Sequence, residues 1–152
     1  MKVKNLIHPL EQSVEKCIVG FQVEFKKLEF ETGTTYDFKF GDVDATVSLP
    51  TYGLRKYSNI VRVEIVIGTM DAQSAGRALV MICADLDLHC NHAPIRAVLR
   101  DVGPDKMQIV LQFVAEVEDI QESMFASVLI NGLDFACSYK NMWSLERDEG
   151  VA

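Results

Sequence analysis

The strongest structural signal in the sequence is a pair of alternating segments on either side of the dipeptide Gly41-Asp42. Aromatic and polar residues alternate over 36–40, and aliphatic and polar residues alternate over 43–49. This alternation predicts strands with one buried face, and a glycine-aspartate pair favours a two-residue turn between antiparallel strands. Such a turn pairs Phe40 with Val43 on one face. The next expected pairs on that face are Phe38 with Ala45 and Tyr36 with Val47, so the turn and the hydrophobic register predict the same hairpin.

A helix-like repeat precedes this hairpin. Apolar residues over 10–28 recur at steps of three or four positions, which predicts a first helix of up to six turns. The latter half of the segment has a second interpretation, because Phe21, Val23 and Phe25 alternate with polar residues as in a strand. We favour the helix, and a strand within residues 20–28 remains the alternative.

The middle of the chain predicts a third strand and a second helix. Apolar residues alternate over 60–67, and Gly68 is expected to end that strand. Asp71 can cap a helix, and the apolar residues that follow keep helical spacing as far as Leu88.

The last third of the chain predicts a second hairpin and a closing helix. Alternation over 95–100 and over 107–115 flanks a Gly103-Pro104-Asp105 turn. Asp119 or Ser123 can then start a helix with one broad apolar face. The complete order is helix, three strands, helix, two strands and helix (αβββαββα). This order indicates an α+β fold in which a twisted antiparallel sheet packs with helices.

Length, composition and charge bound the class of protein. The 152 residues suit a single domain over 1–152, and an apolar content of 49% argues against disorder. The formal charge is −7 without a run of lysine and arginine, so we expect no nucleic-acid partner. The longest uncharged stretch, Ser123 to Leu133, is far shorter than the ~20 residues of a membrane-spanning helix. Charged residues near the start interrupt any secretory signal, so we expect a cytoplasmic protein.

Residues with chemical potential are few and scattered. Asp85 and His89 would lie one helical turn apart with Cys90 and His92 just beyond, and zinc accepts all three ligand types. This spacing matches no strong metal motif, and polar residues at a helix end usually meet solvent. Cys17, Cys83 and Cys137 have apolar neighbours and no paired spacing, so we expect reduced, buried thiols. We therefore predict a binding protein with no metal, no cofactor and no catalytic residue.

The element order, size and acidic charge together resemble the class I type III secretion chaperones, the Tir-chaperone or CesT-like family of small bacterial cytosolic proteins. The resemblance covers nearly the whole chain, from the amphipathic segment 10–28 to the closing segment 129–145. That closing segment is similar to the family's final helix, in which a tryptophan often stands two residues before a leucine, as Trp143 does before Leu145. The connection over 50–59 is longer than the family pattern.

The resemblance implies a homodimer that binds the extended N-terminal segment of a secreted effector and keeps it competent for export. Binding would combine apolar grooves with strand addition at an open sheet edge. By this resemblance the dimer contact maps onto Leu79, Ile82, Leu86, Ala97 and Leu99, and we assign the effector groove to Leu10, Val14, Phe38, Val47 and Val63. Periodicity alone does not distinguish either set from ordinary core residues.

Two other interpretations stay open. A YbjN-like regulatory or binding protein would share a similar fold, would also be non-enzymatic and would need no effector. A small metal-binding protein would use the cluster of Asp85, His89, Cys90 and His92.

Overall fold

The Gly41-Asp42 hairpin forms as the sequence predicts. In the computed structural model, which describes residues 9–50, 60–89, 95–116 and 120–151, β2 (Gly33–Phe40) and β3 (Val43–Pro50) pair antiparallel. Phe40 lies opposite Val43, and the pairs Phe38 with Ala45 and Tyr36 with Val47 follow. Gly41 has a φ of 61°, a left-handed conformation that tight hairpin turns require and that glycine adopts without steric cost.

Within the described residues, six strands form one antiparallel sheet in the order β1-β2-β3-β4-β6-β5. Besides β2 and β3, its strands are β1 (Phe25–Phe30), β4 (Ile60–Asp71), β5 (Ile95–Gly103) and β6 (Lys106–Glu116). The helices are α1 (Pro9–Gly20), α2 (Ala72–His89) and α3 (Glu122–Val151). The α+β class and the order of helix, three strands, helix, two strands and helix are confirmed, and one further strand, β1, precedes the three.

The first helix is shorter than expected. α1 ends at Gly20, where the Phe21 amide donates to the carbonyls of Cys17 and Ile18 at 3.2 and 3.1 Å. Residues 25–30, whose first part we expected to be helical, instead pair with β2 along their whole length. The prediction of helix as far as Leu28 was wrong. The alternative of a strand is correct for residues 25–28, whereas residues 21–24 form a turn and a short connection. Helical spacing is a local preference, and backbone pairing with the edge of β2 outweighs it.

β4 continues past the glycine that was expected to end it. Its register with β6 shifts between Val66 and Gly68, so the glycine lies at a bulge and the strand runs on to Asp71. Asp71 caps α2 as predicted, because its carboxylate accepts from the amide of Ser74 at 2.9 Å and from its hydroxyl at 2.7 Å. These two bonds lower the pKa of Asp71. No residue separates β4 from α2.

The second hairpin is also confirmed, with β5 and β6 paired antiparallel around the predicted turn. Asp105 takes a left-handed φ of 55° in this turn, which aspartate tolerates better than most residues. α3 begins at Glu122, next to the predicted start at Ser123. The other predicted start, Asp119, and most of the connections expected over 50–59 and 89–94 lie outside the described residues.

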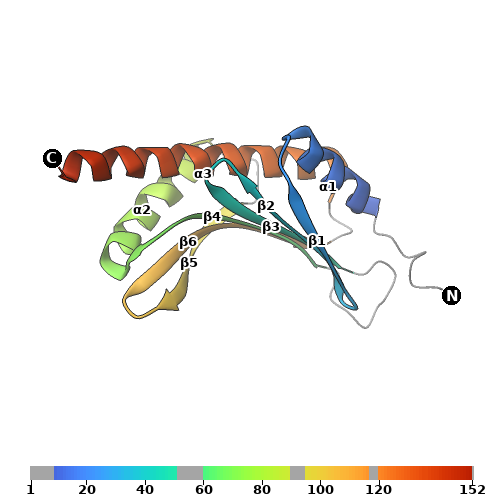
Figure 1. Ribbon diagram of the computed structural model, residues 1–152, viewed down its shortest axis with the longest axis horizontal. Helices are drawn as coiled ribbons and strands as arrows, with labels where there is room; N and C mark the ends of the chain where they lie inside the picture. The colour runs from blue at the N-terminus through green and yellow to red at the C-terminus, as the bar shows by residue number, and fades with distance from the viewer. Residues whose placement is uncertain (1–8, 51–59, 90–94, 117–119, 152) are drawn as a thin grey trace.

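The three helices lie on one face of the sheet, and the other face carries none of them (Figure 1). α3 lies over the sheet. α1 lies near the β1 edge of the sheet, and α2 lies near the β5 edge (Figure 1). Among the described residues, no helix is long and apolar enough to cross a bilayer.

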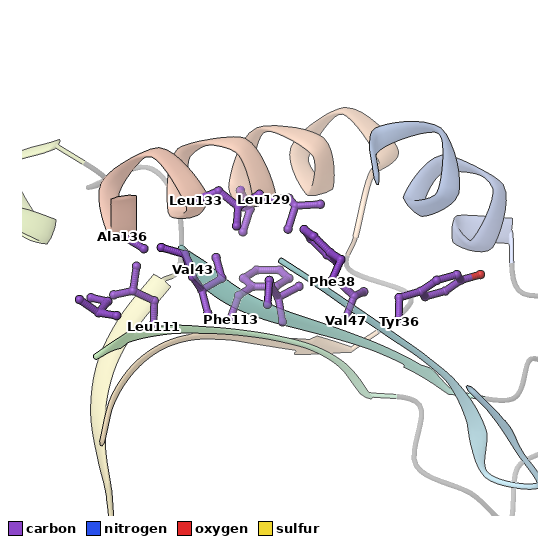
Figure 2. Packing of buried hydrophobic residues seen from close by; sticks show 14 of the residues in the cluster. Tyr36, Phe38, Val43, Val47, Leu111, Phe113, Leu129, Leu133 and Ala136 are labelled. Atoms are coloured by element: carbon purple, nitrogen blue, oxygen red, sulfur yellow. The ribbon is translucent and has the colours of Figure 1, made fainter. Parts of the chain in front are cut away.

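One hydrophobic core fills the space between the helices and the sheet. Side chains from α3 such as Leu129, Leu133 and Ala136 point toward Phe38, Val43 and Phe113 on the strands (Figure 2). α3 comes especially close to β4 at Gly132, where an added Cβ would lie 2.8 Å from Cδ1 of Ile65. A glycine in the helix interior therefore allows a close helix-to-sheet contact despite its low helix propensity.

Candidate functional site: partner-binding surfaces

The side of α2 that faces away from the sheet carries several exposed apolar side chains, with the charged residues Arg77 and Asp87 among them. Val80 and Leu88 have exposed fractions of 71% and 75%. Together with Met81, Cys83 and Ala84 they form the outer face of α2. The opposite side of the helix packs into the core through Ala75, Ala78, Ile82 and Leu86. A helix that covers a sheet needs only one apolar side, so the outer face is available to a partner.

The residues expected at a dimer contact lie on the core side of their elements. Ile82 and Leu86 are buried, Leu79 is half-buried, and Ala97 and Leu99 pack partly buried against the core. Their role in a dimer stays a prediction. The outer face was not predicted, because the prediction rested on the apolar stripe that faces the core. The available signal was a second stripe at positions 80, 84 and 88, spaced by four residues.

The residues assigned to the effector groove lie together in the core. Leu10 and Val14 on α1, Phe38 on β2, Val47 on β3 and Val63 on β4 are each 6% exposed or less. They share one cluster beneath α1 and α3, as Figure 2 shows for Phe38 and Val47. A direct contact with a client stays a prediction, and in this structure other side chains face outward.

A partly exposed charged cluster attaches α1 to the edge of the sheet. Nζ of Lys27 on β1 lies 3.1 Å from Oε1 of Glu11 and 3.0 Å from Oε1 of Glu15. The hydroxyl of Tyr36, a buried residue of β2, donates to Oε1 of Glu15 at 2.9 Å. Lys27 lies opposite Tyr36 in the register, and its ammonium stands 5.8 Å from the centre of the ring. The lysine on the edge strand therefore points toward α1 and links the helix to the sheet.

The charges in this cluster stabilise one another. Burial raises the pKa of Glu15, but hydrogen bonds from Lys27 and Tyr36 and the charge of Lys27 outweigh it and hold the pKa below 4.5. Burial lowers the pKa of Lys27, and the two glutamates more than reverse that effect. Burial and the neighbouring carboxylates raise the pKa of Tyr36, which stays a neutral donor. The cluster was not predicted, because residue 27 was expected to be helical. The available signal was a pair of glutamates one turn apart beside the apolar face of α1.

The sheet has two edge strands. Within the described residues, β1 pairs only with β2, and β5 pairs only with β6. Phe30, the last residue of β1, is 58% exposed, and Val102 near the end of β5 is also exposed. Each edge therefore offers unpaired backbone groups next to an exposed apolar side chain, which is the combination that strand addition uses.

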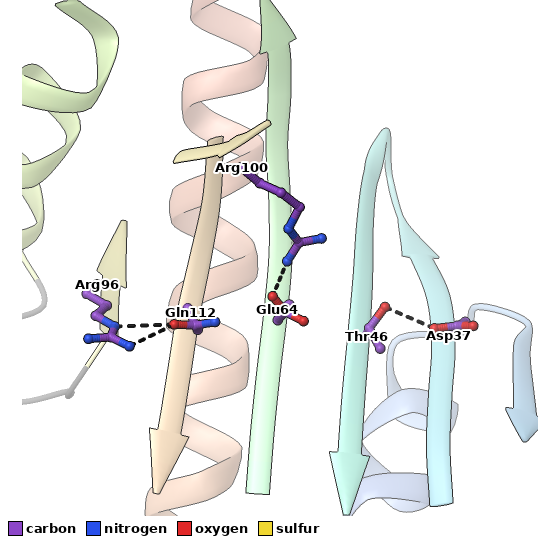
Figure 3. A network of polar contacts seen from close by, with 6 residues as sticks. All are labelled: Asp37, Thr46, Glu64, Arg96, Arg100 and Gln112. Carbon is purple, nitrogen blue, oxygen red and sulfur yellow. Dashed lines mark hydrogen bonds and ion pairs between the residues drawn. The ribbon is translucent and has the colours of Figure 1, made fainter. Parts of the chain in front are cut away.

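A polar row crosses the uncovered face of the sheet. By register it runs through all six strands, in the order Lys26, Asp37, Thr46, Glu64, Gln112 and Arg96. The Thr46 hydroxyl donates to Asp37 at 2.9 Å, and Arg96 donates twice to Oε1 of Gln112, at 3.3 and 3.0 Å. Arg100, two same-face positions along β5 from Arg96, pairs with Glu64 across β6, and α3 lies behind the sheet in this view (Figure 3).

The residues considered for metal binding do not come together in the described part of the structure. Asp85 accepts a hydrogen bond from the Tyr139 hydroxyl, which gives it a structural partner. Cys90, His92 and the side chain of His89 lie outside the described residues, as does the side chain of Trp143. Among the described residues there is no group of three or more histidine, cysteine, aspartate or glutamate side chains that could hold a metal.

The cysteines only partly follow the expectation of buried thiols. Cys17 and Cys137 are free and half-buried, and burial raises the pKa of both thiols. The prediction was wrong for Cys83, which is free and exposed on the outer face of α2. Its apolar sequence neighbours belong to the outer face rather than to the core.

No protein-family model and no curated protein matches this sequence. Among solved structures, an uncharacterized protein from Methanothermobacter thermautotrophicus is similar with a TM-score of 0.51 and 11% identity, over 91% of this chain and 97% of that one. That likeness concerns the fold alone. YbjN, a putative transcription regulator from E. coli, has a TM-score of 0.49 and 12% identity over 93% of this chain and 96% of its own. A chain of the ExsC-ExsE complex has a TM-score of 0.44 and 16% identity over 87% of this chain and 94% of its own.

Proposed function

We propose that this protein is a non-enzymatic, homodimeric chaperone of the cytoplasm that binds an extended segment of a secreted effector and keeps it competent for export. The observation that carries the proposal is the outer face of α2, where Val80, Met81 and Leu88 are exposed on a helix whose other side already packs into the core. The resemblance in element order and in the segment 129–145 supports the choice of a chaperone. A single domain over 1–152 is part of this proposal.

The outer face of α2 suits contact with a second copy of the chain. Val80 and Leu88 lie one turn on either side of Ala84, whose small side chain permits close approach of two helices. If two copies cross antiparallel at Ala84, Val80 of each meets Leu88 of the other, as a two-fold axis requires. The contact is thus self-complementary, and it removes both large exposed side chains from water.

The client is assigned to the other end of the sheet. β1 is the edge farthest from β5, next to which α2 lies, so a dimer through α2 leaves β1 accessible. An extended client segment can add to β1 through backbone hydrogen bonds, with an apolar side chain against Phe30. Such binding keeps the segment extended and involves no change in covalent bonds.

The dimer is tested by light scattering. The wild-type protein is expected to have a mass of about twice 17.0 kDa, the mass of one chain. The double variant Val80→Glu, Leu88→Glu is expected near 17.0 kDa, because in a dimer four buried carboxylates would face one another across the two-fold axis. Val19→Glu on α1 is the matched control, since Val19 is 62% exposed and lies outside the outer face of α2. A wild-type mass of one chain, or a double variant that stays dimeric, contradicts the dimer proposal.

The client is tested by purification of tagged protein from the native organism, with export measured in parallel. We expect one protein bound in stoichiometric amount, protected from protease over an N-terminal segment and no longer exported when this chain is deleted. Phe30→Asp should reduce the bound amount about tenfold, because it removes an apolar contact beside the added strand. Val102→Asp, on the other edge strand, should leave it unchanged. Recovery of a bound protein whose export does not depend on this chain would refute the chaperone assignment.

A further inference from the structure

The uncovered face of the sheet divides into two chemically different halves. On β1, β2 and β3 it carries hydroxyls and a balanced set of charges, with Lys26 and Lys39 against Asp37 and Asp44. On β4, β6 and β5 it carries three arginines and two glutamates, Glu64 and Glu116, around four valines. We name the arginines and valines of this half the arginine–valine patch. Its members are Arg62, Arg96, Arg100, Val66, Val98, Val110 and Val114.

The centre of the patch is apolar. Val110 on β6 lies opposite Val66 on β4 and opposite Val98 on β5, so three valines form one row across three strands. Val110 is 0% exposed although it is not part of the main core cluster. Arg100 on β5 reaches across β6 to pair with Glu64 on β4 (Figure 3), and by register this bridge passes over Val110. The methylene groups of the arginine therefore cover the valine.

Two of the three arginines form no ion pair with any residue that the structure describes. Arg100 is neutralised by Glu64, whereas Arg96 donates to the uncharged amide of Gln112. Arg62 is exposed and forms no ion pair with any residue that the structure describes. Glu116 on β6, one same-face position from Val114, is the other acidic residue of this half. Three arginines therefore stand against two glutamates, and in a chain with a formal charge of −7 this half keeps a positive charge beside an apolar surface. Charge complementarity favours an acidic partner with aliphatic side chains.

The register sets the spacing that such a partner needs. Arg62 lies opposite Val114 and Arg96 opposite Gln112, so the two arginines are two strands and one same-face step apart. With strands ~4.8 Å apart and same-face residues ~6.7 Å apart, their attachment points are separated by roughly 12 Å. Residues four positions apart in an extended chain are separated by ~13 Å. The midpoint of the line falls on β6, halfway between Val114 and Gln112.

We propose that the arginine–valine patch binds an extended peptide segment with two acidic residues four positions apart and an aliphatic residue midway between them. The acidic residues pair with Arg62 and Arg96, and the aliphatic residue packs on Val114. The site lies on the face opposite the helices, away from the outer face of α2 and from the β1 edge, and it stands whether or not the protein is an export chaperone. A nucleic acid fits less well, because the patch has valines where single-stranded binders have aromatic rings for base stacking.

The test is an NMR titration of ¹⁵N-labelled full-length protein with a seven-residue peptide. The peptide has glutamate at its second and sixth positions, valine at its fourth position and threonine at the others. We expect shifts in amides of β4, β6 and β5 and a dissociation constant that rises about tenfold for the double variant Arg62→Gln, Arg96→Gln. The matched control is Lys26→Gln, Lys39→Gln on the balanced half of the same face, which should bind as the wild type does. All four positions are exposed, so both variants should keep the wild-type spectrum elsewhere.

Two further ligands decide the identity of the partner. A peptide with lysine in place of both glutamates should cause no shifts in the patch, and equal shifts would overturn the charge argument. A thymidine oligonucleotide should bind no more tightly than the glutamate peptide. Tighter oligonucleotide binding that is lost in the double arginine variant would replace the peptide assignment with a nucleic-acid one. Shifts confined to β1 would overturn the proposal that the arginine–valine patch binds the peptide, and they would leave the proposal of client binding at the β1 edge intact.

Discussion

Replacement of Gly33 by alanine is expected to lower the free energy of unfolding by about 3 kcal/mol and the melting temperature by roughly 10 °C. Gly33 has a φ of 155° where the chain turns from β1 into β2. A Cβ at this position would lie 2.0 Å from the carbonyl oxygen of Leu49 and 3.0 Å from Cα of Pro50. Both atoms belong to the backbone of β3, so the hairpin register would have to change to make room.

The measurement is thermal and urea unfolding followed by circular dichroism, with Gly76→Ala as the control. Gly76 lies within α2, and an added Cβ there meets no atom within 4 Å. The control should therefore gain about 0.5–1 kcal/mol from improved helix propensity. Equal stability of the Gly33 variant and the wild type would show that the β1–β2 turn differs from the one described.

Lys27→Met is expected to cost about 2 kcal/mol, because Glu11 and Glu15 lose their shared cation while methionine keeps the apolar stem. The side chain of Lys27 is 33% exposed, so solvent screens the effect below that of a fully buried pair. Lys26→Met is the matched control, since Lys26 is the neighbouring residue on the opposite face of the same strand. Its substitution should change the free energy of unfolding by less than about 0.5 kcal/mol.

The same cluster makes the difference in the free energy of unfolding between the wild type and Lys27→Met depend on pH. In the folded chain the pKa of Glu15 lies below its ordinary value of 4.5. The stabilisation that ionised Glu15 gives to the folded state is therefore complete above pH 4.5, and it is lost as the pH falls through the pKa of the folded chain. The stability difference should therefore narrow between pH 5 and pH 3. Urea unfolding of both proteins across this range measures it. A difference that stays constant in acid would show that Lys27 acts through packing alone.

The elements that could be predicted from the sequence are those in which two local signals agree. The 36–49 hairpin combines a two-residue turn with matching apolar positions, and Asp71 combines a capping side chain with the start of helical spacing. In both places the structure follows from residues close together in the chain.

The features that could not be predicted depend on residues far apart in the chain. Whether residues 25–30 form a helix or a strand is decided by the edge of β2, and local spacing fits both. Gly68 resembles a strand end, but pairing with β6 carries β4 through it as a bulge. The candidate surfaces show the same limit. The arginine–valine patch joins three strands that are not consecutive in sequence, so its charges become neighbours only when β6 inserts between β4 and β5.

The direct passage from β4 into α2 has a mechanical consequence. With no connecting residue and with the Asp71 cap at the junction, α2 cannot tilt without pulling on a strand that has neighbours on both sides. A protein docked on the outer face of α2 would therefore slow hydrogen exchange at amides of β4 that it never touches. Contact at one end of the molecule would in this way be transmitted to the middle of the sheet as added rigidity.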